Sequence, residues 1–290
     1  MKKIITIAFT LITIIFFSSC ETDVTNDISL VETPPRLVID GGLERDIKTP
    51  VTTQQIRLLT TAPFLSNKDF PFVSDAQVTI SNGTNSWVFE HTNNGFYENS
   101  DIILEIGNTY TITILWKGET YQGTDTLKEE VPRFDKFYFE FEEETVFADE
   151  GYFIKFDTTD PINVQNFYHY RLFKNNEFVT VPDPGNSQVL VVSDEFFDGK
   201  QRIGVNPNED IFFEIGDIAT AQQLSISEPY FDYLKELFTQ TGNLGNPIVG
   251  NPPPASIRGN LINLDNSNNR ALGYFYVVDI EEDTIIITEN

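Results

Sequence analysis

Clustered carboxylates are the residues of this chain whose types and spacing most directly indicate chemistry. Asp194, Glu195 and Asp198 flank a turn that ends at Gly199. Their hard oxygen atoms are the ligands that Ca²⁺ prefers, although the spacing does not match an EF-hand loop. The sequence therefore makes these three residues a candidate calcium site, with a solvated acidic loop as the alternative interpretation.

Other acidic clusters carry a weaker indication. They are Asp157 with Asp160 and Asn163, and Glu142–Glu144 with Asp149 and Glu150. Two carboxylates that face each other can hydrolyse a glycosidic bond. Because the chain contains 44 acidic residues, pairs of this kind arise by chance. A carboxylate-dependent hydrolase is therefore the less favoured function.

Histidine chemistry has little support. His91 and His169 are the only histidines, and each stands alone in a strand-like run. A zinc site usually needs several close ligands. No nucleophile elbow, phosphate-binding loop, dinucleotide fingerprint or His-Glu-x-x-His motif occurs. We therefore expect no catalytic residue, no cofactor and no enzymatic activity.

The single cysteine, Cys20, lies where a bacterial lipoprotein carries its lipid. Lys2 and Lys3 precede an apolar run over residues 4–17 that is too short to span a bilayer, and Ser18-Ser19 stands directly before Cys20. This layout predicts a signal peptide over residues 1–19, cleavage before Cys20, and attachment of acyl chains such as palmitate there. An ordinary secretory signal with an incidental cysteine is the alternative.

Charge and cysteine content exclude several classes of protein. The formal net charge is −25, and loss of Lys2 and Lys3 with the signal peptide, which holds no acid, changes it to −25 − 2 = −27. Such a chain repels nucleic acid, so we exclude nucleic-acid binding. The acidity is explained by solubility, with calcium or a basic partner as alternatives. No disulfide can form, so stability must come from a packed core.

The fold is predicted to be mainly β. Residues 20–35 read as a tether, and residues 36–131 as an Ig-like β-sandwich of short strands separated by turns. Alternation is clearest at 76–80 and 110–116, and Lys117-Gly118 is a turn signal after the latter. Trp87 and Trp116 lie in strands of this domain, where core packing is the favoured role.

The second predicted domain, residues 132–290, is β-rich with one amphipathic helix. Phe137, Phe139 and Phe141 alternate with Glu140 and Glu142, which predicts a strand with one buried face. Apolar residues at helical spacing from Tyr230 to Phe238 predict a helix over 228–240. Strands are expected at 167–173 and 272–278, and the tail 284–288 is either an added edge strand or frayed.

The Gly-, Asn- and Pro-rich loop 242–256 follows that helix. Long loops that are apolar in part are frequent sites of contact with partners. We therefore expect a partner-facing element formed by Asn246, Pro247, Pro252, Pro253 and Pro254.

A series of short motifs resembles the DUF4249 family of Bacteroidota lipoproteins. Besides the region around Cys20, the motifs are Pro35–Gly41, Ala76–Ile80, Gly95–Tyr97, Gly107–Tyr110, Tyr230–Leu237, Gly259–Asn263 and Leu272–Phe275. The resemblance implies an outer-membrane lipoprotein, often encoded beside a TonB-dependent receptor, with no catalytic residue to carry over. Glu21 and Asp23 fit loosely with export of such lipoproteins to the cell surface.

These inferences predict a lipid-anchored, surface-exposed outer-membrane lipoprotein. It would act as a non-catalytic accessory or ligand-binding subunit of a TonB-dependent transporter. An adhesin or an envelope-structural lipoprotein is the alternative.

Overall fold

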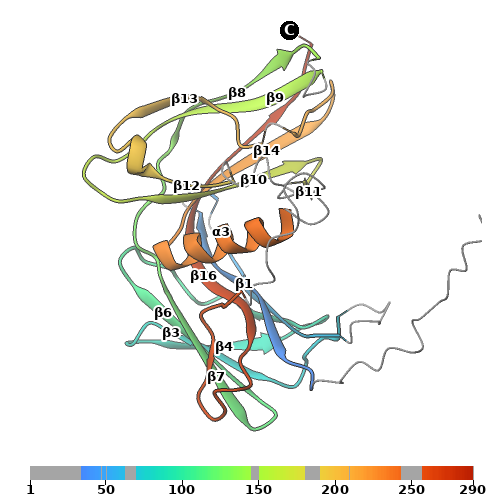
Figure 1. The fold of residues 1–290 in the computed structure, drawn as a ribbon, viewed down its shortest axis with the longest axis vertical. Coiled ribbons are helices and arrows are strands. Elements are labelled where there is room, and N and C mark those ends of the chain that lie inside the picture. Colours follow the sequence, from blue (N-terminus) through green and yellow to red (C-terminus); the bar gives the residue numbers. More distant parts are fainter. Residues whose placement is uncertain are drawn as a thin grey trace, which may run out of the picture. The chain divides into compact units, whose positions relative to one another are not determined.

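The computed structural model describes residues 34–46, 48–49, 51–62, 70–144, 150–179, 190–208, 210–242 and 257–289. The predicted signal peptide, Cys20 and the partner-facing residues Asn246, Pro247, Pro252, Pro253 and Pro254 lie outside these ranges. Residues 35–290 form one compact unit that is mainly β, as the sequence predicts (Figure 1). Among the described residues, no helix is long and apolar enough to cross a membrane.

Eight strands form the predicted β-sandwich. In order across the sheet they are β1 (Leu37–Asp46), β2 (Gln54–Thr60), β5 (Phe96–Asn99), β4 (Ser86–His91), β3 (Gln77–Ser81), β6 (Thr109–Trp116), β7 (Glu119–Thr126) and β15 (Ile262–Asn263). The order turns back at β4, which pairs with β5 and with β3. Alternate residues point inward, so Ile56 of β2 and Ile112 of β6 share one core.

The hairpin between β6 and β7 shows how local sequence sets the register. Lys117 and Gly118 have positive φ angles of 51° and 80°, and Trp116 pairs with Glu119 across this two-residue turn. Turns with positive φ at both central positions match the right-handed twist of the flanking strands. The turn predicted at Lys117-Gly118 is therefore confirmed.

The C-terminal part of the chain also builds the sandwich. The long strand β16 (Leu272–Ile286) runs parallel to β1, and Phe275 and Val277 enter the sandwich core with Leu261. The sequence predicted two pieces here, with the tail either as an added edge strand or frayed. Instead β16 is continuous and central, because β14 pairs with its other side. A division into separate domains at residue 131 stays a prediction, but the two segments share one sheet.

The part of the fold that contains the second half of β16 has three layers. The middle layer is β16 with β14 (Ile218–Ser225), β10 (Phe167–Lys174), β11 (Glu177–Phe178) and β12 (Val191–Ser193). A separate sheet of β8 (Phe134–Glu142), β9 (Gly151–Thr159) and β13 (Gln201–Val205) covers one face, and the helix α3 (Glu228–Gly242) covers the other. Strand alternation separates the faces: Leu224 packs toward α3, whereas Ala221 packs toward β9.

The helix and strand β8 test two sequence predictions. The helix begins at Glu228 as predicted, and the Ser227 hydroxyl caps it by accepting a hydrogen bond from the Tyr230 N–H at 3.3 Å. Strand β8 is less buried than its alternation suggests. Phe137 and Phe139 are half-buried, but Phe141 is 50% exposed, because β8 is an edge strand that pairs only with β9 among the described strands.

Two buried carboxylates of β16, Asp279 and Glu281, join the sandwich to the three layers. We call them the carboxylate clamp. Asp279 binds Arg45 at 2.7 Å and accepts a hydrogen bond from the Val131 N–H at 2.8 Å. Glu281 binds Lys48 at 2.5 Å and Arg133 at 2.7 Å. The connection at residues 130–134 is thereby bound to β16.

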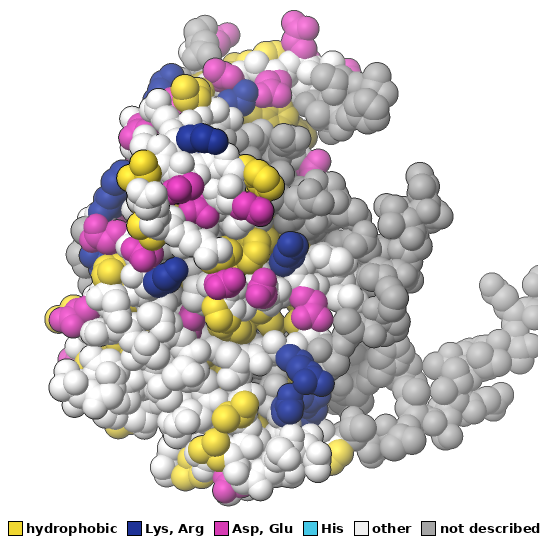
Figure 2. All heavy atoms as spheres, turned by 60° about the vertical axis from the view of Figure 1, so that its left-hand side comes forward, with side chains coloured by type: hydrophobic (Ala, Val, Ile, Leu, Met, Phe, Trp, Pro, Cys, Tyr) yellow, Lys and Arg dark blue, Asp and Glu magenta, His cyan; other side chains and the backbone are white. Residues whose placement is uncertain are grey.

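The acidic surface has no single focus on the face drawn in Figure 2. Asp and Glu side chains there are spread among Lys and Arg side chains. Dispersed carboxylates keep a protein soluble without creating a strong docking field. This face therefore fits the solubility explanation of the acidity better than the explanation by a basic partner.

Candidate functional site

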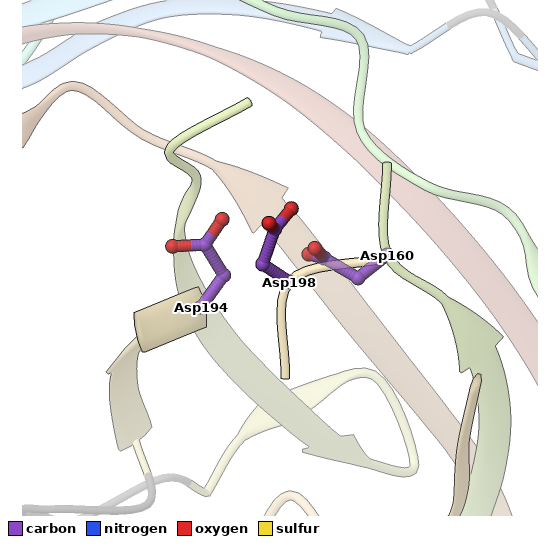
Figure 3. Close-up of side chains that lie close together, drawn as sticks. All are labelled: Asp160, Asp194 and Asp198. Atoms are coloured by element: carbon purple, nitrogen blue, oxygen red, sulfur yellow. The ribbon is translucent and has the colours of Figure 1, made fainter. Parts of the chain in front are cut away.

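Three carboxylates from two segments meet beside β9 and β12. Asp160 directly follows β9, Asp194 opens the 3₁₀ turn Asp194–Phe196 after β12, and Asp198 follows that turn. One oxygen of each lies within 4.8 Å of the others. Figure 3 shows the three side chains side by side, Asp194 and Asp198 from one turn and Asp160 from the end of β9.

Backbone amides of the loop after β9 hold two of these carboxylates in position. Asp194 accepts a hydrogen bond from the Asn166 N–H at 2.9 Å, and Asp198 accepts one from the Asn163 N–H at 2.7 Å. Asn163 has a positive φ of 61°, a conformation that asparagine adopts more readily than most residues. The loop after β9 and the turn after β12 are therefore tied together by the carboxylates themselves.

Asp160 has a different set of donors and a perturbed pKa. It accepts hydrogen bonds from the Tyr168 hydroxyl at 2.6 Å and from the Gly199 N–H at 3.1 Å. Burial raises the pKa of Asp160, the two hydrogen bonds oppose that shift, and the charges of Asp194 and Asp198 add to it. Burial and the neighbouring Asp160 likewise raise the pKa of the Tyr168 hydroxyl.

The cluster lacks a compensating cation within the part of the chain that the structure describes. Asp160 and Asp194 are only 4% and 3% exposed, and no Lys or Arg forms a salt bridge with them or with Asp198. Close carboxylates disfavour one another's charged form unless a cation offsets the repulsion. Carboxylate oxygens at this spacing can bind a hard divalent cation such as Ca²⁺.

The structure rearranges the predicted calcium ligands. Asp194 and Asp198 do come together, but Glu195 is exposed and lies outside the group. Its place is taken by Asp160, from a cluster that the sequence ranked lower. Nothing in the local sequence signals this contact, since Asp160 and Asp194 are far apart in the chain. Calcium binding itself stays a prediction.

Calcium should raise the melting temperature of this protein relative to a chelator. A ligand at 100 times its Kd that binds only the folded state stabilises it by about 2.7 kcal/mol. Asp194→Asn should abolish the response, whereas Glu195→Gln, an exposed neighbour outside the group, should keep it. Thermal melts in calcium and in chelator check both variants, and identical curves for the native protein would contradict the prediction.

The other residues singled out by the sequence have structural surroundings. His91 lies in exposed β4 against Tyr97, and His169 is buried with Nδ1 3.0 Å from the Leu190 carbonyl oxygen. Burial lowers the pKa of His169 to about 3, so this ring is neutral at physiological pH. Trp116 is 5% exposed and donates a hydrogen bond to Asp75 at 2.9 Å, while Trp87 packs partly buried against the same core.

The remaining acidic clusters do not assemble. Glu142 forms a surface salt bridge with Lys155 at 2.8 Å. Glu143, Glu144 and Glu150 are exposed, whereas Asp149 lies outside the described residues. Asp157 accepts a hydrogen bond from the Gly204 N–H at 2.8 Å. The exposed Glu143, Glu144 and Glu150 fit the solvated-loop interpretation, whereas Glu142 lies in β8 and Asp157 is half-buried in β9.

A cleft of about 610 Å³ lies beside the N-terminus of α3. Its lining includes Asp125 and Glu228, together with hydroxyl side chains of Thr124 and Ser227. Asp125 is 6% exposed, and burial raises the pKa of its carboxyl to about 6. The Val277 N–H donates a hydrogen bond to it at 2.9 Å, which ties β7 to β16.

Sequence reasoning overlooked Asp125, although a signal was available. Inward positions alternate along β7 from Tyr121 through Gly123 to Asp125, so strand periodicity alone places this carboxylate inside the fold. A buried carboxylate with a raised pKa beside a cleft is a recognised indicator of a functional site. Here its hydrogen bond to Val277 also gives it a structural role.

These features define a mainly β protein in which a sandwich and a three-layer region share one long C-terminal strand. The model of the family described as "Domain of unknown function (DUF4249)" matches residues 21–284. The chain therefore belongs to this family, as the short motifs indicated. No curated protein and no solved structure matches the chain.

Proposed function

We propose that this protein is a lipid-anchored outer-membrane lipoprotein, exposed on the cell surface, that serves a TonB-dependent transporter as a non-catalytic accessory or ligand-binding subunit. The observation that carries the proposal is the position of the single cysteine, Cys20, at the end of a signal-like apolar run. The family match begins at residue 21, directly after this cysteine. A body that starts with β1 at Leu37 then follows a short connecting segment.

The fold supports a binding role. The carboxylate clamp joins the sandwich to the three layers through Arg45, Lys48 and Arg133. A rigid body of this kind can hold a partner or ligand in a defined orientation on a membrane. The cleft beside α3, with hydroxyl and carboxyl groups in its lining, is where a small polar ligand would bind.

Cys20→Ala should release the protein from the membrane fraction while leaving its fold intact. Lipid attachment requires the thiol, and acyl chains supply the anchoring free energy at about 0.8 kcal/mol per buried CH₂ group. Labelling with a palmitate analogue, membrane fractionation and circular dichroism check the three parts of this expectation. Thr22→Ala is the matched control, and loss of folding in Cys20→Ala alone would contradict the anchor.

The partner is tested by pulling down tagged protein from its native membrane in mild detergent. Recovery of an outer-membrane barrel of the TonB-dependent type supports the transport role. Absence of any barrel favours the alternative of an adhesin or an envelope-structural lipoprotein. Protease treatment of intact cells tests surface exposure, because a periplasmic protein stays uncut.

A carboxylate-dependent hydrolase is the less favoured alternative. It requires two carboxylates that face each other in one cleft, and the acidic residues lining the cleft beside α3 are Asp125 and Glu228. Against this, the Asp125 side chain is almost fully buried and accepts the Val277 N–H. A general acid must reach its substrate within hydrogen-bonding distance.

A further inference from the structure

Exposed phenylalanine side chains belong to the segment that pairs with the end of β2. Phe70 is 60% exposed and Phe72, two residues further on, is 47% exposed, while Phe96 of β5 is half-buried. Arg57 of β2 completes the group, with its guanidinium 5.2 Å from the Phe72 ring centre and 5.0 Å from that of Phe96. We call these four residues the aromatic patch.

The backbone fixes the patch to the end of β2. Phe72 forms a bridge with Leu59, and the Val73 N–H donates to the Leu58 carbonyl oxygen at 3.0 Å. Gly95 approaches the same strand so closely that a Cβ on it would lie 2.4 Å from the Leu58 oxygen. The exposed rings are therefore held outward by a paired backbone.

The Arg57 guanidinium uses only part of its hydrogen-bonding capacity within the described residues. Its Nε donates to the Asn94 carbonyl oxygen at 3.2 Å. Within the described ranges, its terminal nitrogens have no hydrogen bond or salt bridge, although Asp40 lies opposite on β1. A guanidinium with both terminal nitrogens available can bind a phosphate through two parallel hydrogen bonds.

The patch lies where the chain enters the fold. The Thr61 N–H donates to the Arg36 carbonyl oxygen at 3.0 Å, and Thr60 pairs with Leu37, the first residue of β1. From Cys20 to Arg36 the chain advances by 16 residues, which span at most roughly 55 Å when fully extended. An anchored Cys20 thus keeps Arg36 within that distance of the membrane and holds the body, with the patch, at high effective concentration there.

We propose that the aromatic patch contacts the headgroup layer of the membrane that holds Cys20. The rings of Phe70 and Phe72 enter the interface, and Arg57 donates to a lipid phosphate. The contact is tested on zwitterionic lipid, because the strongly negative protein is repelled by anionic lipid. The inference rests on the lipid anchor in the proposed function and adds the orientation of the body on the membrane.

Site-specific labelling of the lipidated protein in phosphatidylethanolamine–phosphatidylcholine vesicles tests this contact. Cys20 is the only cysteine and its thiol is acylated in the mature protein, so Phe72→Cys supplies a single free thiol for an environment-sensitive fluorophore. Ile262→Cys is the matched control, since Ile262 is 55% exposed on β15, which is separated from β2 by five strands in the sheet order. Nitroxide-labelled lipids then quench fluorophores that touch the interface.

The possible results of this experiment distinguish failure of the membrane contact from failure of the lipid anchor. We expect quenching at position 72 to be several-fold stronger than at position 262, with a blue-shifted emission. Protein that floats with the vesicles but shows equal quenching at the two positions contradicts the membrane contact alone. Protein that does not float contradicts the lipid anchor and, because it depends on the anchor, the membrane contact as well. Shielding at position 72 only in native membranes would show that a protein covers the patch, which also overturns the proposal.

Discussion

Arg45→Met should lower the free energy of unfolding by about 3–5 kcal/mol at pH 7, because removal of one partner leaves a buried charge uncompensated. The Asp279 side chain is 1% exposed and depends on Arg45 at 2.7 Å and on the Val131 N–H. Urea denaturation at pH 7 measures the loss.

The pH dependence of this loss has a definite sign. Burial already raises the pKa of Asp279, and hydrogen bonding to Arg45 opposes that rise. Without Arg45 the native-state pKa rises further, so the folded variant binds a proton more readily than the unfolded chain. Stability of the variant then falls as pH increases through that range, and its deficit should be smaller at pH 5 than at pH 7.

Two further variants test whether the buried, unpaired charge of Asp279 causes the loss of stability. Asp279→Asn in the Arg45→Met background should recover much of the loss, because the amide is neutral and its oxygen still accepts the Val131 N–H. Lys155→Met removes two salt bridges to the exposed Glu140 and Glu142, and should cost at most about 1 kcal/mol. Equal losses for Arg45→Met and Lys155→Met would contradict the importance of burial.

Gly259→Ala should prevent folding. A Cβ at Gly259 would lie 1.5 Å from the carbonyl oxygen of Gly273, a backbone atom that cannot move aside. The next residue, Asn260, donates to the Phe275 carbonyl oxygen at 2.7 Å and accepts from its N–H at 2.9 Å. Because the displaced backbone belongs to β16, we expect a loss above about 4 kcal/mol, in the range that marks a severe structural conflict.

Soluble yield and circular dichroism of the variant check this result. Gly83→Ala is the control, since Gly83 has a positive φ of 85° but a Cβ added there would meet no other atom within 4 Å. Its cost should be limited to the left-handed backbone, roughly 1–2 kcal/mol. A stable Gly259→Ala protein would show that the two segments separate more easily than the structure indicates. The contact also explains the Gly259-Asn260 and Leu272-Gly273 motifs that resemble the family.

Local patterns in the sequence predicted most of the strands, the hairpin turn and the helix, but they divided β16 into two pieces. The reason is physical: Asp279, Glu281, Glu282 and Asp283 interrupt the apolar pattern in the middle of this strand. Two of these acids are buried, since Arg45, Lys48 and Arg133 neutralise them from distant parts of the chain. Single-sequence periodicity cannot detect such long-range partners.

The cluster of Asp160, Asp194 and Asp198 was predicted only in part, because one of its members comes from a distant segment. Asp194 and Asp198 are neighbours in sequence and one short turn brings them together. Asp160 joins them only because β9, β10 and β12 place the loop after β9 beside that turn, where the Asn166 N–H binds Asp194. The buried Asp125, in contrast, could have been found from the alternation of β7.

The parallel pairing of β1 with β16 has a consequence for how the protein acquires its structure. Val38 pairs with Leu272, so the first strand of the sandwich, which pairs with β2 on its other side, lacks its parallel partner until a segment near the end of synthesis has been made. Contacts between distant segments slow folding, because the intervening chain must be closed before they form. A nascent chain lacking β16 therefore cannot complete the sandwich core, to which Phe275 and Val277 of this strand contribute.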